Sequence, residues 1–382
     1  MKVIFMLPAL SLALLFPWLS LPLQTFASLD NTWGSKSGHR GWERRVSAKA
    51  DLKRSVPTSL YPPSPNTEDQ HWNSSPTCGR FNSSPSYQGI PGERHFLPPS
   101  VSRGLDLSRI RNVVVFGDSY STLGQNNGSP VRPAVLTGDS ALAGGRASNG
   151  PTWAEYLAKN ISANIYGFAH GGAVVDSKIV GRRSPTGTGI GPNTNDFAHQ
   201  WQSYRPLGLK LRSEETLHII FFGINDASLT ITAAGGIEGS FDRALRETMP
   251  KVADRVLDFM QEMVDVLGPT NFLVADVEAS PYYTKKLFSN LSSFSESSYV
   301  SGFSVTYVLV AELLKSLRAQ PGKYGFKDAE SCLARGDYTL DHVCRDWNEH
   351  PFWISSHPST QLHLILSEFV TSVVQDCKEE EE

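Results

Sequence analysis

The sequence has little net charge of either sign, because 35 lysine and arginine residues nearly balance 38 aspartate and glutamate residues. Proteins that bind nucleic acid or an anionic membrane usually present a basic face, and this balance favours neither class. The chain also lacks a Gly-x-Ser-x-Gly elbow, a His-Glu-x-x-His pair, a Walker loop and a dinucleotide-binding fingerprint. Ordinary α/β-hydrolases, zinc proteases, P-loop proteins and nicotinamide-dependent enzymes rely on these motifs, so we predict none of these classes and no organic cofactor.

Long hydrophobic runs are missing after the first 27 residues, so we predict no membrane span in the rest of the chain. The first 27 residues begin with Met1-Lys2, continue as an apolar stretch to Leu23 and lead to a small-residue site at Ala27-Ser28. This order is typical of a secretory signal peptide, and three prolines within it disfavour the alternative of an uncleaved anchor. We therefore expect a secreted, extracellular protein whose residues 1–27 are removed.

Cysteine is scarce, with four residues in the whole chain. None has the Cys-x-x-Cys or His-x-x-x-His spacing of a metal site, so we predict no bound metal. Cysteines in a secreted chain favour disulfides instead. Cys332 and Cys344 are close enough in sequence to close a short loop, and we predict a disulfide between them. Cys78 and Cys377 are a second candidate pair, which would tie the N-terminal segment to the last helix.

Ser119 is the candidate nucleophile of this sequence. It lies in the segment Val115–Ser121, at the end of an apolar run that begins at Val113 and is expected to form a strand. A serine on a sharp turn between strand and helix is well placed to attack a carbonyl carbon. The alternative is an ordinary helix cap, because Gly-Asp-Ser turns also begin many helices.

Ser119 lies in the first of four sequence blocks, and the three blocks that follow it favour the role of nucleophile. The blocks are Phe116–Tyr120, Ala169–Ala173, Phe222–Asp226 and Phe352–Pro358. Together they resemble the GDSL-type esterases, also called SGNH hydrolases, over the length from Arg111 to Val373. The segment Asn149–Leu157 is similar to fungal members that remove acetyl groups from carbohydrates, the carbohydrate esterase family 16 type.

The resemblance implies a role for each block. Ser119 would attack the ester carbonyl, and His357 would accept its proton as general base. The oxyanion hole would consist of the Ser119 and Gly172 backbone N–H groups and the Asn225 side-chain amide. Gly171 and His170 would line the substrate pocket.

The sequence departs from the family pattern at Ile354. Family members place the acid that orients the histidine three residues before it, and Ile354 occupies that position here. Loss of this acid costs about 10⁴ in turnover in related triads, so the departure predicts a slow enzyme rather than necessarily an inactive one. The Ile354 backbone carbonyl is the first candidate substitute, and the carboxylate of Asp346 or Glu349 is the second.

Strand and helix patterns alternate, which predicts a three-layer α/β/α sandwich with a central, mostly parallel sheet, similar to flavodoxin. We expect strands at Val113–Phe116, Ile165–Phe168, Leu217–Phe222 and Phe272–Asp276. Helices are expected at Pro151–Asn160, Phe241–Leu267, Ser301–Leu317 and Gln361–Val374. Functional groups on such sheets gather beyond the carboxyl ends of the strands, where Ser119, Gly172 and Asn225 would emerge.

The hydrolase domain is expected to span residues 109–377, with an acidic tail at 378–382. Residues 28–108 are rich in Ser, Pro, Asn and Gly and predict a disordered linker or pro-segment, with a sugar-binding appendage as the alternative. Asn-x-Ser sequons, consistent with glycosylation in the secretory pathway, begin at Asn73, Asn82, Asn127, Asn160 and Asn290.

These inferences predict a secreted serine esterase that removes acetyl groups from sugars or hemicellulose oligosaccharides. Its partner would be a small-molecule or oligosaccharide ester rather than a nucleic acid or a membrane, and the oligomeric state is left open. A lipid-ester acylhydrolase is the alternative substrate class. Because Ile354 replaces the acid, the alternative from another class is a catalytically degenerate protein that binds carbohydrate or a partner.

Overall fold

The computed structural model describes residues 75–81, 97–180, 196–235, 240–334 and 336–379, with the side chains of 297–301 left out. All of these residues belong to one compact unit, which lies within residues 54–382. The predicted signal peptide therefore lies outside the described residues. Within them, no helix has the length and apolar character needed to cross a membrane.

A six-stranded sheet forms the centre of the fold, in the order β1-β6-β5-β4-β2-β3. Only β1 runs antiparallel to its neighbour, and the other pairs are parallel. The strands are β1 (Val101–Arg103), β2 (Asn112–Gly117), β3 (Asn164–Gly167), β4 (Thr216–Phe221), β5 (Asn271–Asp276) and β6 (Val305–Leu309). Two short strands, β7 (Ser331–Leu333) and β8 (Phe352–Ile354), pair separately.

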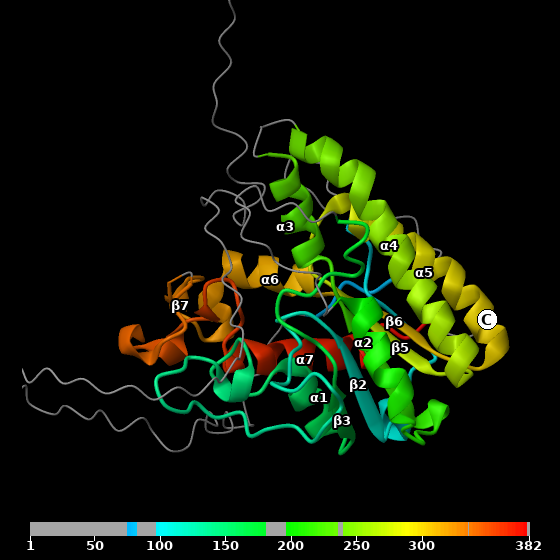
Figure 1. Cartoon of the computed structure of the whole chain (residues 1–382), viewed down its shortest axis with the longest axis horizontal. Helices are drawn as coiled ribbons and strands as arrows, with labels where there is room; N and C mark the ends of the chain where they lie inside the picture. The colour runs from blue at the N-terminus through cyan, green and yellow to red at the C-terminus, as the bar shows by residue number, and fades with distance from the viewer. Residues whose placement is uncertain (1–74, 82–96, 181–195, 236–239, 335, 380–382) are drawn as a thin grey trace, which may run out of the picture. The chain divides into compact units, whose positions relative to one another are not determined.

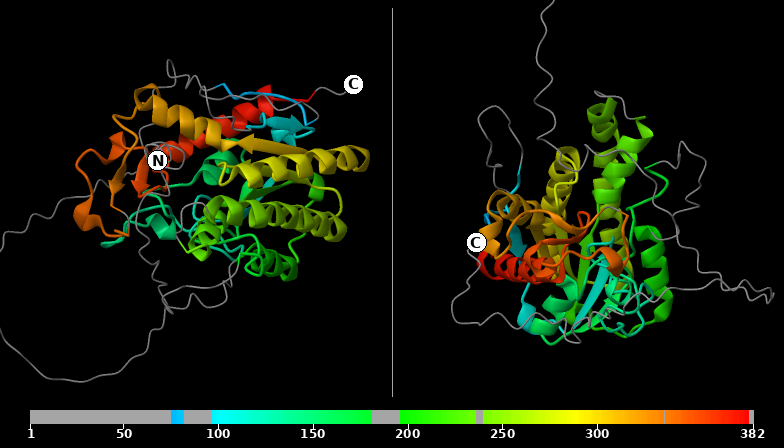
Figure 2. Two further views of the ribbon diagram at one scale, coloured as in Figure 1. Left: turned by 90° about the horizontal axis from the view of Figure 1, so that it is seen from above. Right: turned by 90° about the vertical axis from the view of Figure 1, so that its left-hand side faces the viewer.

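Helices cover both faces of this sheet (Figures 1 and 2). They are α1 (Trp153–Asn160), α2 (Phe197–Tyr204), α3 (Ile224–Ala233), α4 (Ser240–Leu267), α5 (Pro281–Ser301), α6 (Val310–Ala319) and α7 (Thr360–Asp376). Short 3₁₀ helices lie at Leu107–Arg109, Ala143–Gly145, Arg205–Leu207, Ser213–Glu215, Pro321–Tyr324, Leu340–His342 and Trp347–Glu349.

The core divides at the sheet, because successive strand side chains point to opposite faces. In β2, Val114 and Phe116 pack in one buried cluster with α2 to α5, whereas Val113 and Val115 pack in another with α1, α6 and α7. Helices α4 and α5 lie side by side on the first face, and α1 lies against α7 on the second (Figure 2). The predicted three-layer sandwich with a mostly parallel sheet is confirmed.

One predicted element, the helix at Ser301–Leu317, is wrong over its first half. The structure has strand β6 at Val305–Leu309, and helix α6 begins directly after it at Val310. Every residue of β6 is buried, so the strand lacks the alternation of apolar and polar residues that marks a half-exposed strand. Such a strand, followed at once by an amphipathic helix, cannot be divided from it by periodicity alone. The preceding helix, α5, and the edge strand β1 were not predicted.

The expected linker at 28–108 is wrong where it is described, because residues 75–81 and 97–108 pack on the domain. Val101–Arg103 pairs with β6 as an edge strand. A disulfide joins Cys78 to Cys377 at the end of α7, and both carboxylate oxygens of Glu312 accept the Thr77 N–H at 3.1 Å. Residues 28–74 and 82–96 lie outside the described residues.

The far C-terminus and one sequon also differ from expectation. Lys378 pairs with Ser102, and the Glu379 N–H donates to the Ser102 carbonyl at 2.9 Å, so the described part of the tail joins the sheet edge. Asn290 is buried and its amide donates to Asp254 at 3.0 Å, so this sequon is not exposed on the folded domain. Asn127 and Asn160 are exposed, whereas Asn73 and Asn82 lie outside the described residues.

Candidate active site

The turn that carries Ser119 is held in place by contacts with other elements. Strand β2 ends at Gly117, whose N–H donates to the Gln200 side chain at 2.9 Å and whose carbonyl accepts from the same amide at 2.8 Å. A Cβ on Gly117 would lie 2.9 Å from the Phe221 carbonyl oxygen, so only glycine fits this close approach. Ser119, two residues later, is partly exposed at the carboxyl end of the strand.

Asp118 holds this turn. Its buried carboxylate accepts the Tyr120 N–H at 3.0 Å, and its backbone carbonyl accepts the Ser121 N–H. Burial raises the pKa of Asp118 to about 7, although the bond from Tyr120 acts in the opposite direction. Asp118 therefore shapes the turn beneath Ser119.

Ser119 and His357 meet across the fold. The His357 Nε2 atom lies 2.9 Å from the Ser119 Oγ atom, and both side chains are partly exposed. His357 Nδ1 lies 3.1 Å from the Ser355 backbone carbonyl, which can only accept a hydrogen bond. This contact places the proton on Nδ1 and leaves Nε2 free to accept the serine proton, as a general base must.

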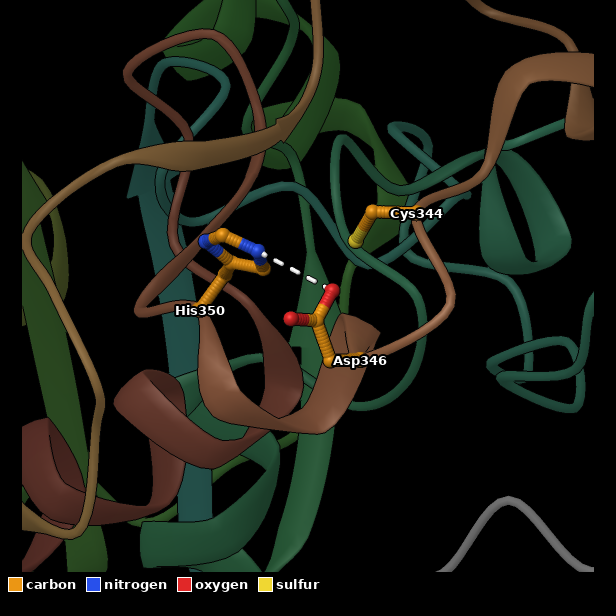
Figure 3. A group of neighbouring side chains, drawn as sticks. All are labelled: Cys344, Asp346 and His350. Carbon is orange, nitrogen blue, oxygen red and sulfur yellow. Dashed lines mark ion pairs between the residues drawn. The ribbon is translucent and has the colours of Figure 1, made fainter.

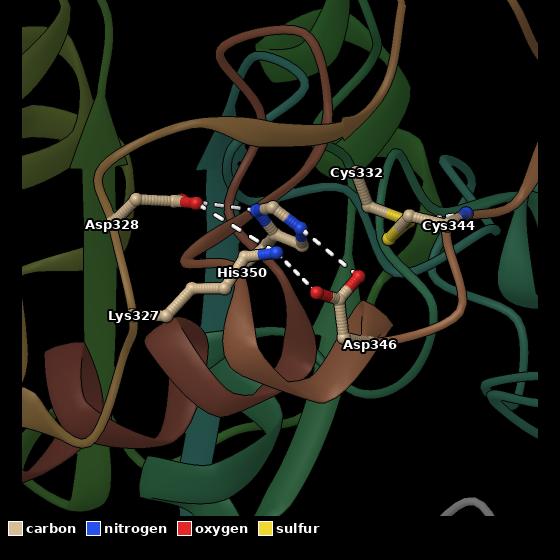
Figure 4. The surroundings of a disulfide bond; sticks show 6 residues. All are labelled: Lys327, Asp328, Cys332, Cys344, Asp346 and His350. Atoms are coloured by element: carbon tan, nitrogen blue, oxygen red, sulfur yellow. Dashed lines mark hydrogen bonds and ion pairs between the residues drawn. A yellow bond between two sulfur atoms is a disulfide. The ribbon is translucent and has the colours of Figure 1, made fainter.

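The group that orients His357 is the Ser355 carbonyl, and both predicted substitutes are wrong. The Ile354 carbonyl accepts the backbone N–H of His357 at 2.7 Å rather than its ring N–H. The Asp346 carboxylate bonds to Lys327 and pairs with His350 at 3.5 Å (Figure 4). Because Asp346 is held by these partners, it makes no bond to His357.

The Ile354 side chain lies in an apolar environment. It is buried in a small apolar cluster with Ala141, Leu333 and Trp353. The position at which the family pattern places an acid is therefore buried and apolar in this chain.

Replacing Ile354 with aspartate is therefore expected to destabilise the fold rather than to complete a triad. A carboxylate placed in this apolar cluster lacks partners, and we expect a loss of about 3–5 kcal/mol in the free energy of unfolding. Denaturant titration of Ile354→Asp and Ile354→Val measures this loss, the valine variant being the control. Unchanged stability together with a faster reaction would show instead that the new carboxylate reaches His357.

The predicted oxyanion residues gather at the same end of the sheet. Asn225 opens α3 after β4, and its amide nitrogen donates to the Ala173 carbonyl at 2.9 Å and lies 3.5 Å from Asp118. Gly172 has a φ of 76°, which glycine adopts freely, and a Cβ built on it would meet no atom within 4 Å. A Cβ on Gly171 would lie 4.0 Å from that of Ser119. The loop between β3 and α2 thus runs directly past the serine.

Two polar side chains secure this loop. The buried Asp226 carboxylate accepts the Val175 N–H at 3.0 Å, which ties the start of α3 to the segment after Gly172. His170 is partly exposed, and its Nδ1 bonds to the Gly171 carbonyl at 2.8 Å. His170 therefore supports the glycine pair through a backbone contact.

The predicted disulfide between Cys332 and Cys344 is present, with a Cα–Cα distance of 5.3 Å. Cys344, Asp346 and His350 form the group in the described part of the chain whose ligand atoms lie close enough for a metal ion (Figure 3). The Cys344 sulfur is already bonded to Cys332, so no thiolate is available to a metal (Figure 4). The disulfide instead fixes β7, which pairs with β8 just before His357.

Comparison with known proteins decides the family. The GDSL-like lipase/acylhydrolase family pattern matches residues 113–368, which include Ser119, Gly172, Asn225 and His357. The chain belongs to this family. As a GDSL-like protein it contains all four blocks, and it lacks an acid at the position three residues before the histidine.

Relatives of this GDSL-like chain are distant. It is 24% identical over 276 residues to the thermolabile hemolysin of Vibrio parahaemolyticus, a match covering 68% of this chain and 63% of that protein. It is 22% identical over 329 residues to the GDSL esterase/lipase EXL2 of Arabidopsis thaliana, covering 67% and 86% respectively. A solved family two carbohydrate esterase from Clostridium thermocellum matches with a TM-score of 0.37 and 13% identity, covering 70% of this chain and 63% of that chain.

Sequence reasoning missed Ser355 and Gln200. The Ser355 contribution is a backbone carbonyl, which any residue supplies, so no residue type marks it. Gln200 lies on α2 with its side chain buried, far in sequence from the strand end that it holds. The sequence signal for it is a glutamine on the same helix face as the buried aromatic residues Phe197, Trp201 and Tyr204.

Proposed function

We propose that this GDSL-like chain is a secreted serine esterase that removes acetyl groups from carbohydrates. The observation that carries the proposal is the 2.9 Å contact between Ser119 Oγ and His357 Nε2, with Asn225 and the glycine pair at the same end of the sheet. A protein that only bound its ligand would have no need of a serine and a correctly oriented imidazole in contact. This favours catalysis over the degenerate binding alternative.

The reaction follows from these groups in two halves. Ser119 Oγ attacks the ester carbonyl while His357 Nε2 accepts its proton, and the imidazolium then protonates the leaving alcohol. The acyl-serine is hydrolysed by a water that His357 deprotonates in turn. The tetrahedral oxyanion would receive hydrogen bonds from the Ser119 and Gly172 N–H groups and from the Asn225 amide, each worth about 3–4 kcal/mol of barrier.

The Ser355 carbonyl supplies part of what an aspartate supplies. It accepts the Nδ1 proton and so fixes the tautomer and the ring orientation of His357. It carries no full negative charge, so it stabilises the imidazolium less than a carboxylate would. We therefore expect an enzyme that is slower than one with a complete triad.

The acetylated-carbohydrate substrate is supported by the resemblance of Asn149–Leu157 to fungal acetylesterases. In this chain Asn149 is buried, and its side chain accepts the Thr360 N–H at 2.8 Å, so it anchors the start of α7 next to His357. The named activities of the Arabidopsis relative, an esterase/lipase, support a lipid ester as the second candidate substrate.

A series of p-nitrophenyl esters separates these substrates. We expect the acetate to exceed the octanoate in kcat/KM by about tenfold or more, because each methylene that a short acyl pocket rejects costs about 1–3 kcal/mol. The measurement compares acetate, butyrate and octanoate below their solubility limits. Preference for octanoate would favour the lipid-ester alternative, and no hydrolysis of any ester would favour a binding protein.

We propose the secretory pathway as the location of this protein, with residues 1–27 as its signal peptide. Two disulfides among the described residues support it, because such bonds persist in oxidising compartments. The proposed hydrolase domain begins before residue 109, since residues 75–81 and 97–108 pack on it. The exposed Asn127 and Asn160 are the sequons best placed to carry glycans.

A further inference from the structure

The turn that carries His357 contains a residue in an uncommon backbone conformation. Ser356 has a φ of 68°, in the left-handed region that costs a residue with a Cβ some backbone energy. Such a residue persists when its surroundings hold it there. The contacts of its backbone groups are therefore informative, because Ser356 lies between His357 and the carbonyl of Ser355 that orients it.

Both backbone groups of Ser356 are bonded to other elements. Its N–H donates to the Ser331 hydroxyl at 3.3 Å, and Ser331 begins β7 next to the disulfide at Cys332. Its carbonyl accepts the Tyr120 hydroxyl at 2.5 Å. The second contact is the shorter one, and it comes from the residue that directly follows Ser119.

Tyr120 is built for this contact. Its side chain is only 3% exposed, and its ring centroid lies 5.9 Å from that of His357. Burial raises the pKa of the Tyr120 phenol above its ordinary value, so the hydroxyl is protonated and can donate a hydrogen bond at neutral pH. Its own N–H is held by Asp118, which fixes the residue in the nucleophile turn.

We propose that Tyr120 is a positioning residue that locks the base-bearing turn of His357 onto the nucleophile-bearing turn of Ser119. This inference rests on the proposed esterase function of the same site. One bond joins the two turns, so the position of the imidazole is set relative to the residue beside the serine. In a chain with no acid beside the histidine, this bond and the Ser355 carbonyl together set the distance and the tautomer.

Replacing Tyr120 with phenylalanine removes the hydroxyl and keeps the ring. We expect kcat for p-nitrophenyl acetate to fall by about 10- to 100-fold, because small misplacements of a catalytic group cost rate of this order. KM should change by less than about twofold, since the buried hydroxyl contacts protein and not substrate. Tyr324→Phe is the matched control, because Tyr324 is also buried and donates one hydrogen bond, to Ser316 at 2.6 Å on α6.

A spectroscopic readout separates positioning from general stability. In full-length protein labelled with ¹⁵N-histidine, the Nδ1–H proton of His357 should be protected from exchange with water in the wild type and in Tyr324→Phe. In Tyr120→Phe it should exchange about tenfold faster or more, because the Ser355 contact loosens. Thermal midpoints of the two variants provide the comparison of overall stability.

The outcomes distinguish this inference from the proposed function. A Tyr120→Phe variant with wild-type kcat and wild-type proton exchange would overturn the positioning role, while leaving an active wild type as an esterase. Equal losses of kcat in Tyr120→Phe and Tyr324→Phe would assign the effect to stability and also overturn it. If the wild type hydrolyses no ester, the proposed function fails, and the exchange measurement still decides whether Tyr120 holds the His357 turn.

Discussion

Alanine in place of Ser119 is expected to lower kcat for p-nitrophenyl acetate by about 10⁴- to 10⁶-fold. Removal of the nucleophile from a serine hydrolase costs rates of this order, because the residual oxyanion and binding groups cannot form an acyl intermediate. Spectrophotometric initial rates of purified, full-length wild type and Ser119→Ala measure the loss. The rates are compared at saturating substrate, so that a difference in KM does not contribute.

The matched control for this loss is the thermal midpoint. The Ser119 side chain is partly exposed, and the hydrogen bond described for it is the one to His357. Its removal should therefore leave the fold intact. We expect the two midpoints to agree within a few degrees. A rate that falls less than tenfold with an unchanged midpoint would mean that another group is the nucleophile.

The second large loss is expected for His357→Ala. Without the imidazole nothing near Ser119 Oγ accepts its proton, and the loss should approach that of Ser119→Ala, because the two residues act as a unit. The double variant should be about as slow as either single variant. Kinetics of all three proteins at one pH provide the comparison.

Asp346→Asn is the matched control for the histidine. Asp346 bonds to Lys327 and His350 and not to His357, so its replacement should change kcat by less than about twofold. A loss comparable to that of His357→Ala would show that Asp346 acts on the imidazole, and the assignment of the Ser355 carbonyl would fail.

The pH profile gives a further check on His357. Burial lowers the pKa of this imidazole below its ordinary value of 6.5, and the bond to the Ser355 carbonyl partly offsets the shift. The base must be neutral to accept a proton, so activity is present above the lowered pKa and lost as pH falls through it. The acid limb of kcat/KM should therefore have its midpoint below 6.5.

The sequence predicted which residues would lie together where residue types carry the chemistry. Ser119, Asn225 and His357 lie in motifs that indicate an esterase when they occur together. The parallel strands end at one edge of the sheet, which brings Ser119 and Asn225 close to each other. The disulfide between Cys332 and Cys344 followed from short spacing alone. Four of the six strands were predicted because their apolar runs are separated by clear turns or helices.

What the sequence could not supply depends on the backbone or on distant contacts. The Ser355 carbonyl orients His357 because the turn reverses at Ser356, and a carbonyl leaves no mark on residue type. Ile354 occupies the spacing of the missing acid, and only the structure shows that its side chain is buried among apolar residues. The sequon at Asn290 predicted an exposed position, but Asn290 is buried where α5 packs against α4.

Covalent trapping tests the central claim, that Ser119 forms an acyl intermediate with His357 as its base. Wild-type protein is mixed with p-nitrophenyl acetate, quenched in acid within the first turnovers and mapped by peptide mass spectrometry. We predict one acetyl group, on the peptide that contains Ser119, and none on that peptide in Ser119→Ala. Turnover without acetylation of Ser119 in the quenched wild type, or a catalytically competent acetyl group on another residue, would contradict this mechanism.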